Sequence, residues 1–375
     1  MSYINSCEKY NKNFLYKNLN SNYYPQKNSY NYFVVIPIYN ELEYIDYTLR
    51  SLDCQKQSFL NQTLIILVIN NSQNTSSDIV KKNHDTHKLI KNNFYNFEHI
   101  VLDCYSKGNE IKIKDFGVGT ARKIGFDFAL QYSKKTSLFI CLDADTIVSK
   151  RYLKTIVEYY NETLFSACIV DFKHQKSNNV KLNKGIRIYE KALHEMAKKI
   201  KMCNSPYGYV SMGSTIICTS KAYVLIGGMP KKKAGEDFYF MQSLAKYAKI
   251  DFIDKILVYP SSRAEQRVHL GTGYRMNEYK EFNKFDNLFF PDSSYETIKN
   301  IILIAESNFC NSYLKLKKEL IKNLSDKVCN FLNENDIENI WKNISLNSKT
   351  KKQFMIFFHQ WFDAFKIIKL LKYIS

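Results

Sequence analysis

Short apolar runs alternate with helical patterns between about Tyr32 and Tyr259. The runs are too short to be helices and predict strands over Phe33–Ile38, Leu64–Ile69, Ile100–Leu102, Leu138–Leu142, Leu164–Val170, Thr215–Cys218 and Ile250–Tyr259. Between them, apolar residues recur three or four positions apart, as in Leu42, Ile45, Leu49 and Leu52, which predicts helices that cover a sheet. Strands that alternate with helices pair in parallel, because the helix supplies the crossover. We therefore expect an α/β fold with a mostly parallel sheet.

The pattern changes beyond about Lys280. Tyr295 to Ser375 has few strand signals and several helical stripes, such as Ile298, Ile301, Ile302 and Ala305. The first 30 residues are polar and rich in Asn, Tyr and Lys. We therefore expect a loose N-terminal arm over 1–30, an α/β domain over 31–280 and an α-helical C-terminal region over 281–375.

The composition indicates which kinds of binding partner and which cellular compartment suit the chain. Lysine and arginine number 54 against 36 acidic residues, a net charge of +18. This charge suits nucleic acid, an anionic membrane surface or phosphorylated small molecules, and does not choose among them. Nine cysteines without a CxxC pair are typical of reduced thiols in a cytosolic protein. Neither a signal peptide nor a spanning segment is evident, so we expect a cytoplasmic protein, at most peripheral at the inner face of a membrane.

Polar residues punctuate the ends of three predicted strands. They are Asn40-Glu41, Asn70-Asn71 and Asp143-Ala144-Asp145. Ligands of parallel sheets bind beyond the carboxyl ends of the strands, so one nucleotide site that gathers all three is the economical interpretation. Two carboxylates one residue apart offer hard oxygen ligands to Mg²⁺ or Mn²⁺, which can bridge to a diphosphate. A solvated acidic turn is the alternative, but the position after an apolar strand favours the metal site.

An ordered set of motifs resembles the family 2 glycosyltransferases of the GT-A fold. It comprises Val34–Glu41 (VVIPIYNE), Gly119–Gly125 (GTARKIG), Asp143–Asp145, the Gly227–Met229 step and Gly235-Glu236-Asp237. The resemblance extends over about Tyr32 to Gly273. It implies a GT-A fold and a metal-dependent, inverting transfer from a nucleotide-diphospho-sugar, of the hexosyltransferase type. The acceptor implied is a hydroxyl of a saccharide or of a lipid-linked molecule.

The resemblance also assigns roles at the nucleotide and the metal. Asp143 and Asp145 are implied to hold the metal and the nucleotide, and His269 is a further candidate ligand, although a lone histidine is also common as a structural hydrogen-bonder. The implied nucleotide contacts are Pro37, Tyr39, Glu41, Asn70 and Arg122; a solvated helix arginine is the alternative for the last. One departure concerns Asn70–Gln73, because the family has an acidic pair there and asparagine keeps an amide without the charge.

Two further roles follow from the resemblance. Asp237 is implied to be the general base that deprotonates the acceptor hydroxyl, with Glu236 a supporting contact or the alternative base. Carboxylates at the start of a helix also complement its dipole, which is the competing interpretation. In the loop after the last predicted strand, an arginine is implied to clamp the diphosphate, and we favour Arg267 over Arg263.

Other functions remain to be weighed. A sugar-phosphate nucleotidylyltransferase usually begins with a glycine-rich basic loop, which Pro37–Asn40 does not provide. A catalytically degenerate nucleotide-sugar-binding domain stays open because of Asn70-Asn71. Nucleic-acid binding has no motif in its support, so we expect none. The C-terminal segment Phe357–Ile374 mixes aromatic and aliphatic residues with three lysines; it fits a helix packed on the core or a peripheral membrane contact.

Overall fold

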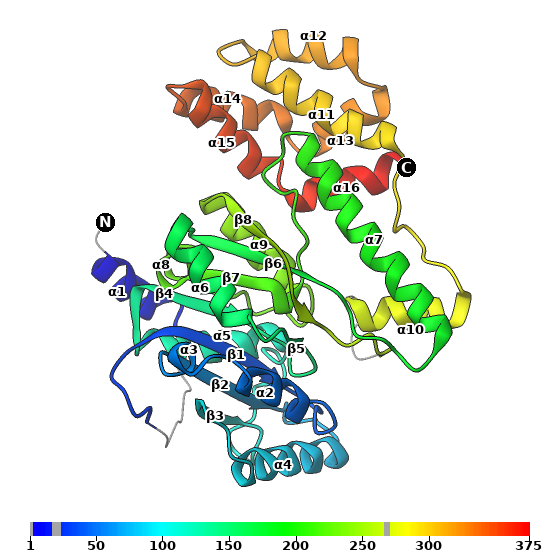
Figure 1. The fold of residues 1–375 in the computed structure, drawn as a ribbon. Helices are drawn as coiled ribbons and strands as arrows, with labels where there is room; N and C mark the ends of the chain where they lie inside the picture. The colour runs from blue at the N-terminus through cyan, green and yellow to red at the C-terminus, as the bar shows by residue number, and fades with distance from the viewer. Residues whose placement is uncertain (1–2, 17–23, 266–270) are drawn as a thin grey trace. The chain divides into compact units, whose positions relative to one another are not determined.

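The computed structural model describes residues 3–16, 24–265 and 271–375. The chain forms two compact units, of which the first comprises residues 1–186 and 211–283 and the second residues 187–210 and 284–375. The sheet lies in the first unit, and helices α11 to α16 lie in the second (Figure 1). The domain boundaries expected from the sequence stay a prediction.

The first unit is built on one eight-stranded sheet, ordered β3-β2-β1-β4-β7-β6-β8-β5. Its strands are β1 (Tyr30–Ile38), β2 (Thr63–Asn70), β3 (Glu98–Cys104), β4 (Ser133–Cys141), β5 (Ile147–Val148), β6 (Ala167–Phe172), β7 (Ile216–Thr219) and β8 (Ile250–Tyr259). β1 pairs in parallel with both β2 and β4, whereas β7 is antiparallel to its neighbours. Every residue of β2 is buried, as expected of a parallel strand covered on both faces. The expected α/β fold with a mostly parallel sheet is confirmed.

The order of the strands places a possible ligand site between β1 and β4. The chain runs from β1 outward through β2 to β3 and then returns to place β4 on the other side of β1. This reversal is a topological switch point, where ligands of open α/β sheets bind beyond the carboxyl ends of the strands. The ends of β1 and β4 carry Glu41 and the triplet Asp143–Asp145.

The first unit also contains the helices that connect and flank these strands. They are α1 (Tyr3–Asn13), α2 (Ile45–Asp53), α3 (Gln57–Leu60), α4 (Ser77–Asn92), α5 (Val118–Leu130), α6 (Tyr152–Thr163), α8 (Ser220–Leu225), α9 (Glu236–Tyr247) and α10 (Thr272–Phe282). Of these, α5 packs closely on the sheet, because a Cβ on Gly125 would lie 2.4 Å from a methyl carbon of Val35. The close approach fixes the position of α5, which contributes Arg122, its fifth residue, to the site described below.

Helix α1 is anchored by a buried polar network that the sequence pattern did not predict. The hydroxyls of Tyr10 and Tyr223 donate to Asp127 Oδ1 at 2.6 and 2.8 Å, and Lys123 Nζ lies 3.0 Å from Asp127 Oδ2. Asp127 and Lys123 are 0% and 3% exposed. Buried charges are tolerated when they are paired and hydrogen-bonded, so Tyr10 of α1 completes a set of partners that α5 requires.

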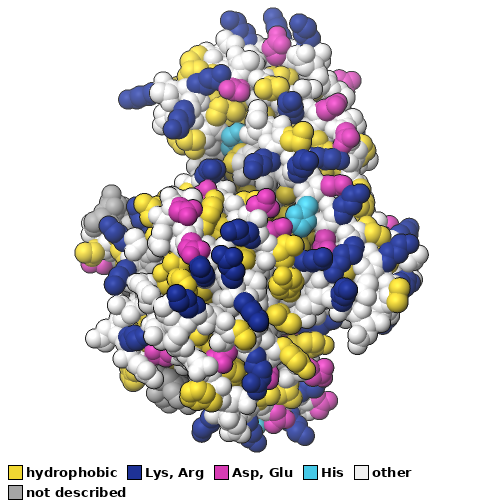
Figure 2. All heavy atoms as spheres, viewed as in Figure 1, with side chains coloured by type: hydrophobic (Ala, Val, Ile, Leu, Met, Phe, Trp, Pro, Cys, Tyr) yellow, Lys and Arg dark blue, Asp and Glu magenta, His cyan; other side chains and the backbone are white. Residues whose placement is uncertain are grey.

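The second unit contains the expected α-helical C-terminal region. Its helices are the end of α7 (Val180–Met202), α11 (Asp292–Ser307), α12 (Tyr313–Asn323), α13 (Asp326–Glu334), α14 (Ile337–Asn347), α15 (Lys351–Trp361) and α16 (Ala364–Ile374). In α16, Ile367 and Leu370 are fully buried while Lys369 and Lys372 are exposed. None of the helices in the described ranges is long and apolar enough to span a membrane. Figure 2 shows lysine and arginine side chains spread among acidic ones over the visible face.

Candidate active site

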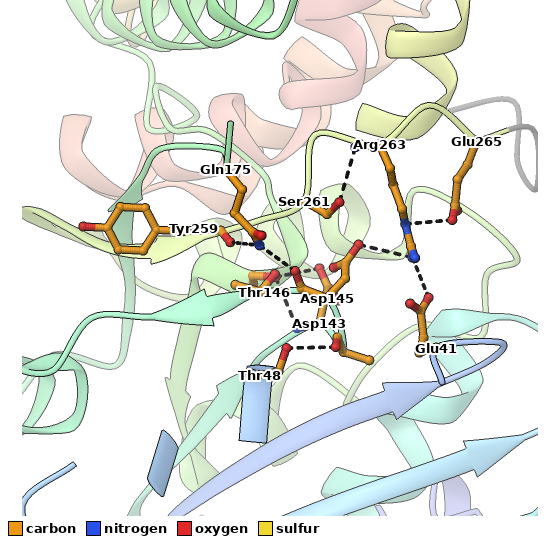
Figure 3. Close-up of polar contacts among 12 residues, drawn as sticks. Glu41, Thr48, Asp143, Asp145, Thr146, Gln175, Tyr259, Ser261, Arg263 and Glu265 are labelled. Atoms are coloured by element: carbon orange, nitrogen blue, oxygen red, sulfur yellow. Dashed lines mark hydrogen bonds and ion pairs between the residues drawn. The ribbon is translucent and has the colours of Figure 1, made fainter. Parts of the chain in front are cut away.

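The acidic triplet Asp143-Ala144-Asp145 follows β4, and neighbouring side chains hold its backbone in place. Thr48 Oγ1 donates to the carbonyl oxygen of Ala144 at 2.8 Å. Gln175 Nε2 donates to the carbonyl oxygen of Asp145 at 2.9 Å (Figure 3). Because these bonds fix the turn on both sides, the fold itself determines where the two carboxylates lie.

Arg122 links this triplet to the second acidic motif of the sequence. Its guanidinium, only 2% exposed, donates through Nη2 to Asp143 and through Nη1 to Glu236. The remaining oxygen of Asp143 accepts from Ser214 Oγ at 2.6 Å. Gly213 leaves the space that the guanidinium needs, since a Cβ there would lie 2.1 Å from Nη2. Burial disfavours the charged guanidinium, but the two carboxylates outweigh it and raise the pKa of Arg122.

Glu236 and Asp237 occupy the first turn of α9. Gly235 precedes them with a φ of 71°, in the left-handed region that glycine tolerates best. Glu236 is 4% exposed, and burial raises its pKa to about 7 despite the opposing charge of Arg122. Burial also raises the pKa of Asp237, whose Oδ1 accepts from its neighbour's backbone N–H at 2.7 Å. Two adjacent carboxyl groups with raised pKa values are suited to proton transfer.

Arg263 forms a second cationic link, on the other side of the triplet. Its Nη2 lies 2.6 Å from Glu41 Oε1 and 3.2 Å from Asp145 Oδ2. Its Nε lies 2.7 Å from Glu265 Oε1, and the guanidinium stacks over the ring of Tyr44 at 4.3 Å. Figure 3 shows Arg263 between Glu41 and Glu265, with Asp145 at its side. The ends of β1, β4 and β8 are thereby joined through one side chain.

The predicted nucleotide contacts of β1 and β2 lie at the same edge. Pro37 is buried within β1, and Tyr39 is half-buried just beyond the strand. Asn70 closes β2, and its side-chain nitrogen donates to the carbonyl oxygen of Ile38 at 2.9 Å. This amide nitrogen therefore links the end of β2 to the end of β1.

The predicted metal site is partly described. Asp143 and Asp145 are present as above, whereas His269 and the predicted diphosphate clamp Arg267 lie outside the described residues. Within the described ranges, no group of three or more His, Cys, Asp or Glu residues could hold a metal ion. Mg²⁺ in nucleotide-dependent enzymes is commonly held by one or two carboxylates together with substrate phosphates. The two aspartates fit a metal that shares its coordination with a bound diphosphate.

Sequence reasoning missed several residues of this site. Ser214, Gly213 and Gln175 belong to no motif, and Arg263 was placed second to Arg267. Their partners lie far away along the chain: Ser214 is 71 residues from Asp143, and Arg263 is 222 residues from Glu41. The available signal for Arg263 was its position just after the strand β8, at the edge where the other polar motifs end.

A mostly parallel α/β sheet with carboxylates gathered at its switch point is typical of proteins that bind nucleotides. Residues 33–216, just under half of the chain, match the model of glycosyl transferase family 2. The chain therefore carries a family 2 glycosyltransferase domain, as the motifs implied. The mixed α/β fold with its mostly parallel sheet agrees with this match.

Comparison with individual proteins is less informative. No curated protein matches the chain significantly. Among solved structures, S. aureus TarS 1–349 in complex with UDP-GlcNAc is similar with a TM-score of 0.42 and 16% identity, over 74% of this chain and 72% of that one. The mannosyltransferase PcManGT from Pyrobaculum calidifontis, in complex with GDP-Man and Mn2+, gives a TM-score of 0.42 and 12% identity, over 96% and 94%. Similarity at this level does not identify a donor or an acceptor.

Proposed function

We propose that this protein is a metal-dependent glycosyltransferase of the hexosyltransferase type that acts with inversion. It transfers a sugar from a nucleotide-diphospho-sugar to an acceptor hydroxyl. One observation carries the proposal: Arg122 ties the strand-end aspartate Asp143 to Glu236, so that the acidic pair and the triplet lie at one edge of the sheet. In the proposed enzyme, the donor side and the acceptor side of the reaction share this buried guanidinium.

The roles divide between the two acidic motifs. Asp145 and Asp143 would hold Mn²⁺ or Mg²⁺, and a bound divalent cation would offset the negative charge of the departing diphosphate. Asp237 takes the proton from the acceptor hydroxyl as that oxygen attacks the anomeric carbon from the face opposite the leaving group. Glu236 stays protonated or paired with Arg122 and so orients the first turn of α9. Arg122 acts here as a positioning residue, because both of its carboxylate partners are protein groups.

Asp237→Asn tests the assignment of the base. The amide keeps the shape of the side chain but cannot accept a proton, so transfer should fall by about 10²–10⁴-fold. Release of nucleoside diphosphate from a panel of nucleotide-sugars, with and without saccharide acceptors, measures the rate. Binding of the donor should change little. Glu236→Gln is the matched control and should retain more activity.

Two results would contradict the assignment of the base, and a third would contradict the proposed activity. If Asp237→Asn turns over at a near-normal rate, Asp237 is not the base. If Glu236→Gln alone abolishes transfer, the base lies one residue earlier. A wild-type protein that binds nucleotide-sugars tightly but neither transfers nor hydrolyses them would identify the catalytically degenerate alternative.

The acceptor belongs to the proposal as well. We infer a saccharide or a lipid-linked acceptor, the latter met at an anionic membrane surface. The observation in its support is the exposed side of α16, where Phe365, Lys369 and Lys372 lie opposite the buried Ile367 and Leu370. Lysines attract anionic headgroups and an exposed aromatic side chain enters the interface, which is the pattern of a peripheral contact.

A further inference from the structure

Arg263 has more carboxylate partners than its charge can balance. Glu41, Asp145 and Glu265 each place an oxygen within 3.2 Å of its guanidinium. The side chains of Arg263, Asp145 and Glu41 are 17%, 18% and 7% exposed, so water screens these contacts only in part. An arginine guanidinium stays protonated in proteins, so Arg263 is a permanent cation at this position.

This cation competes for an atom that the proposed metal would use. Asp145 Oδ2 lies 3.2 Å from Arg263 Nη2. A divalent ion bound to the same carboxylate would lie roughly 2.1 Å from its oxygen. Two cations on one carboxylate are then only about 5 Å apart, and at that separation like charges repel appreciably in a partly buried site. The guanidinium and the metal therefore disfavour one another unless a further anion joins them.

We propose that Arg263 is a built-in counter-ion of the donor site, which fills the place of the metal beside Asp145 and yields it when metal and diphosphate bind together. The inference rests on the proposed metal role of Asp145 and goes beyond it. A diphosphate offers the guanidinium a bidentate partner in exchange for Asp145. Glu41, Glu265 and the ring of Tyr44 hold Arg263 within reach of both positions.

Arg263 accordingly sets how strongly metal and donor depend on one another. Metal without a diphosphate binds weakly, because Asp145 is already paired with Arg263. Metal that binds together with a diphosphate binds more tightly, because the diphosphate takes over the guanidinium. Coupling of this kind is reciprocal, so each ligand strengthens the binding of the other by the same factor. Metal without a donor is thereby disfavoured at the site.

The test measures Mn²⁺ binding directly, by the electron paramagnetic resonance signal of the free ion. Titrations are made without nucleotide and with whichever of UDP, GDP, ADP or CDP stabilises the wild type most in a thermal-shift screen. Arg263→Gln should bind Mn²⁺ alone roughly tenfold more tightly than wild type, since the competing charge is gone. The nucleotide should then enhance Mn²⁺ binding far less. Arg263→Lys keeps the charge and should lie near wild type.

Arg275→Gln is the matched control, because Arg275 pairs with Glu278 at 2.7 Å within α10 and its loss removes the same charge. It should leave Mn²⁺ binding unchanged. The proposal is overturned if Arg263→Gln binds Mn²⁺ no more tightly than wild type while Asp145→Asn weakens binding. If Asp145→Asn also leaves Mn²⁺ binding unchanged, or wild type binds none, then the proposed metal site itself fails. Melting temperatures of all variants show whether each is folded.

Discussion

Glu236 should make the protein less stable as the pH rises, and Glu236→Gln should remove this effect. Burial raises its pKa from the usual 4.5 to about 7, which means that the folded state holds this proton more tightly than the unfolded chain does. Below pH 4.5 the group is neutral in both states and costs nothing. Between pH 4.5 and 7 the unfolded chain releases the proton first, so the free energy of unfolding falls. Above pH 7 the loss is complete.

The size of the effect follows from the same values. Each pH unit between the two pKa values is worth about 1.4 kcal/mol, so Glu236 should cost about 3 kcal/mol of unfolding free energy at pH 8 relative to pH 4. This is a large share of the 5–15 kcal/mol that typically stabilises a protein. Glutamine stays neutral throughout and can still accept a hydrogen bond from Arg122 through its amide oxygen. The variant should therefore gain on the wild type as the pH rises.

Urea unfolding at intervals between pH 4.5 and pH 8 provides the assay. Far-UV circular dichroism follows the whole chain, whereas tryptophan fluorescence follows only the second unit, because Trp341 and Trp361 both lie there. Subtracting the curve of Glu236→Gln from that of the wild type removes the titration of the groups that do not interact with Glu236, so the difference reports Glu236 together with its neighbour Asp237. A difference that stays flat across this pH range would refute the reasoning and show that Glu236 ionises as an ordinary surface carboxyl group does.

Two further predictions concern other parts of the molecule. Lys123→Met leaves Asp127 buried without its cation, so the free energy of unfolding should fall by about 3–5 kcal/mol, as measured by urea denaturation. Lys123→Arg keeps the charge and is the control; a loss below about 1 kcal/mol in Lys123→Met would contradict the prediction. Replacing Lys366, Lys369 and Lys372 of α16 by glutamine should abolish sedimentation with anionic liposomes without changing the melting temperature, and unchanged sedimentation would exclude α16 as the docking element.

The strands of the parallel half of the sheet could be predicted from sequence for a simple reason. Strands buried on both faces must be apolar throughout, so β1 and β2 stand out as continuous runs. The polar residues that end them are conspicuous for the same reason. The prediction was wrong at Leu164, which was assigned to a strand but ends α6 with a φ of 50°. An apolar residue in the left-handed region leaves no trace in a hydrophobic pattern.

The N-terminal helix shows a different limit. Its residues are polar, with only Ser6 and Tyr10 buried, so its sequence lacks a broad apolar stripe. What holds it is a hydrogen bond from Tyr10 to Asp127, 117 residues away. No local pattern can reveal a partner at that distance. The short strand β5 was not predicted either, because two residues are too few to show an alternation of apolar and polar positions.

The candidate site divides in the same way between what a motif shows and what only the fold supplies. Motifs revealed the acidic residues, namely Glu41, the triplet Asp143–Asp145 and Glu236-Asp237. Carboxylates that follow an apolar strand or begin a helix can be recognised from the sequence alone. Their behaviour depends on the cations, and neither arginine could be assigned its partners from sequence. Arg122 joins two motifs that lie 93 residues apart, from Asp143 to Glu236, and Arg263 joins the same triplet, through Asp145, to Glu41. Without these guanidinium groups the carboxylates would repel one another at one edge of the sheet, and their pKa values would rise further. The two arginines therefore determine which acidic residues can bind a metal and which can accept a proton. The chemistry of the acidic motifs depends on two guanidinium groups that lie outside those motifs.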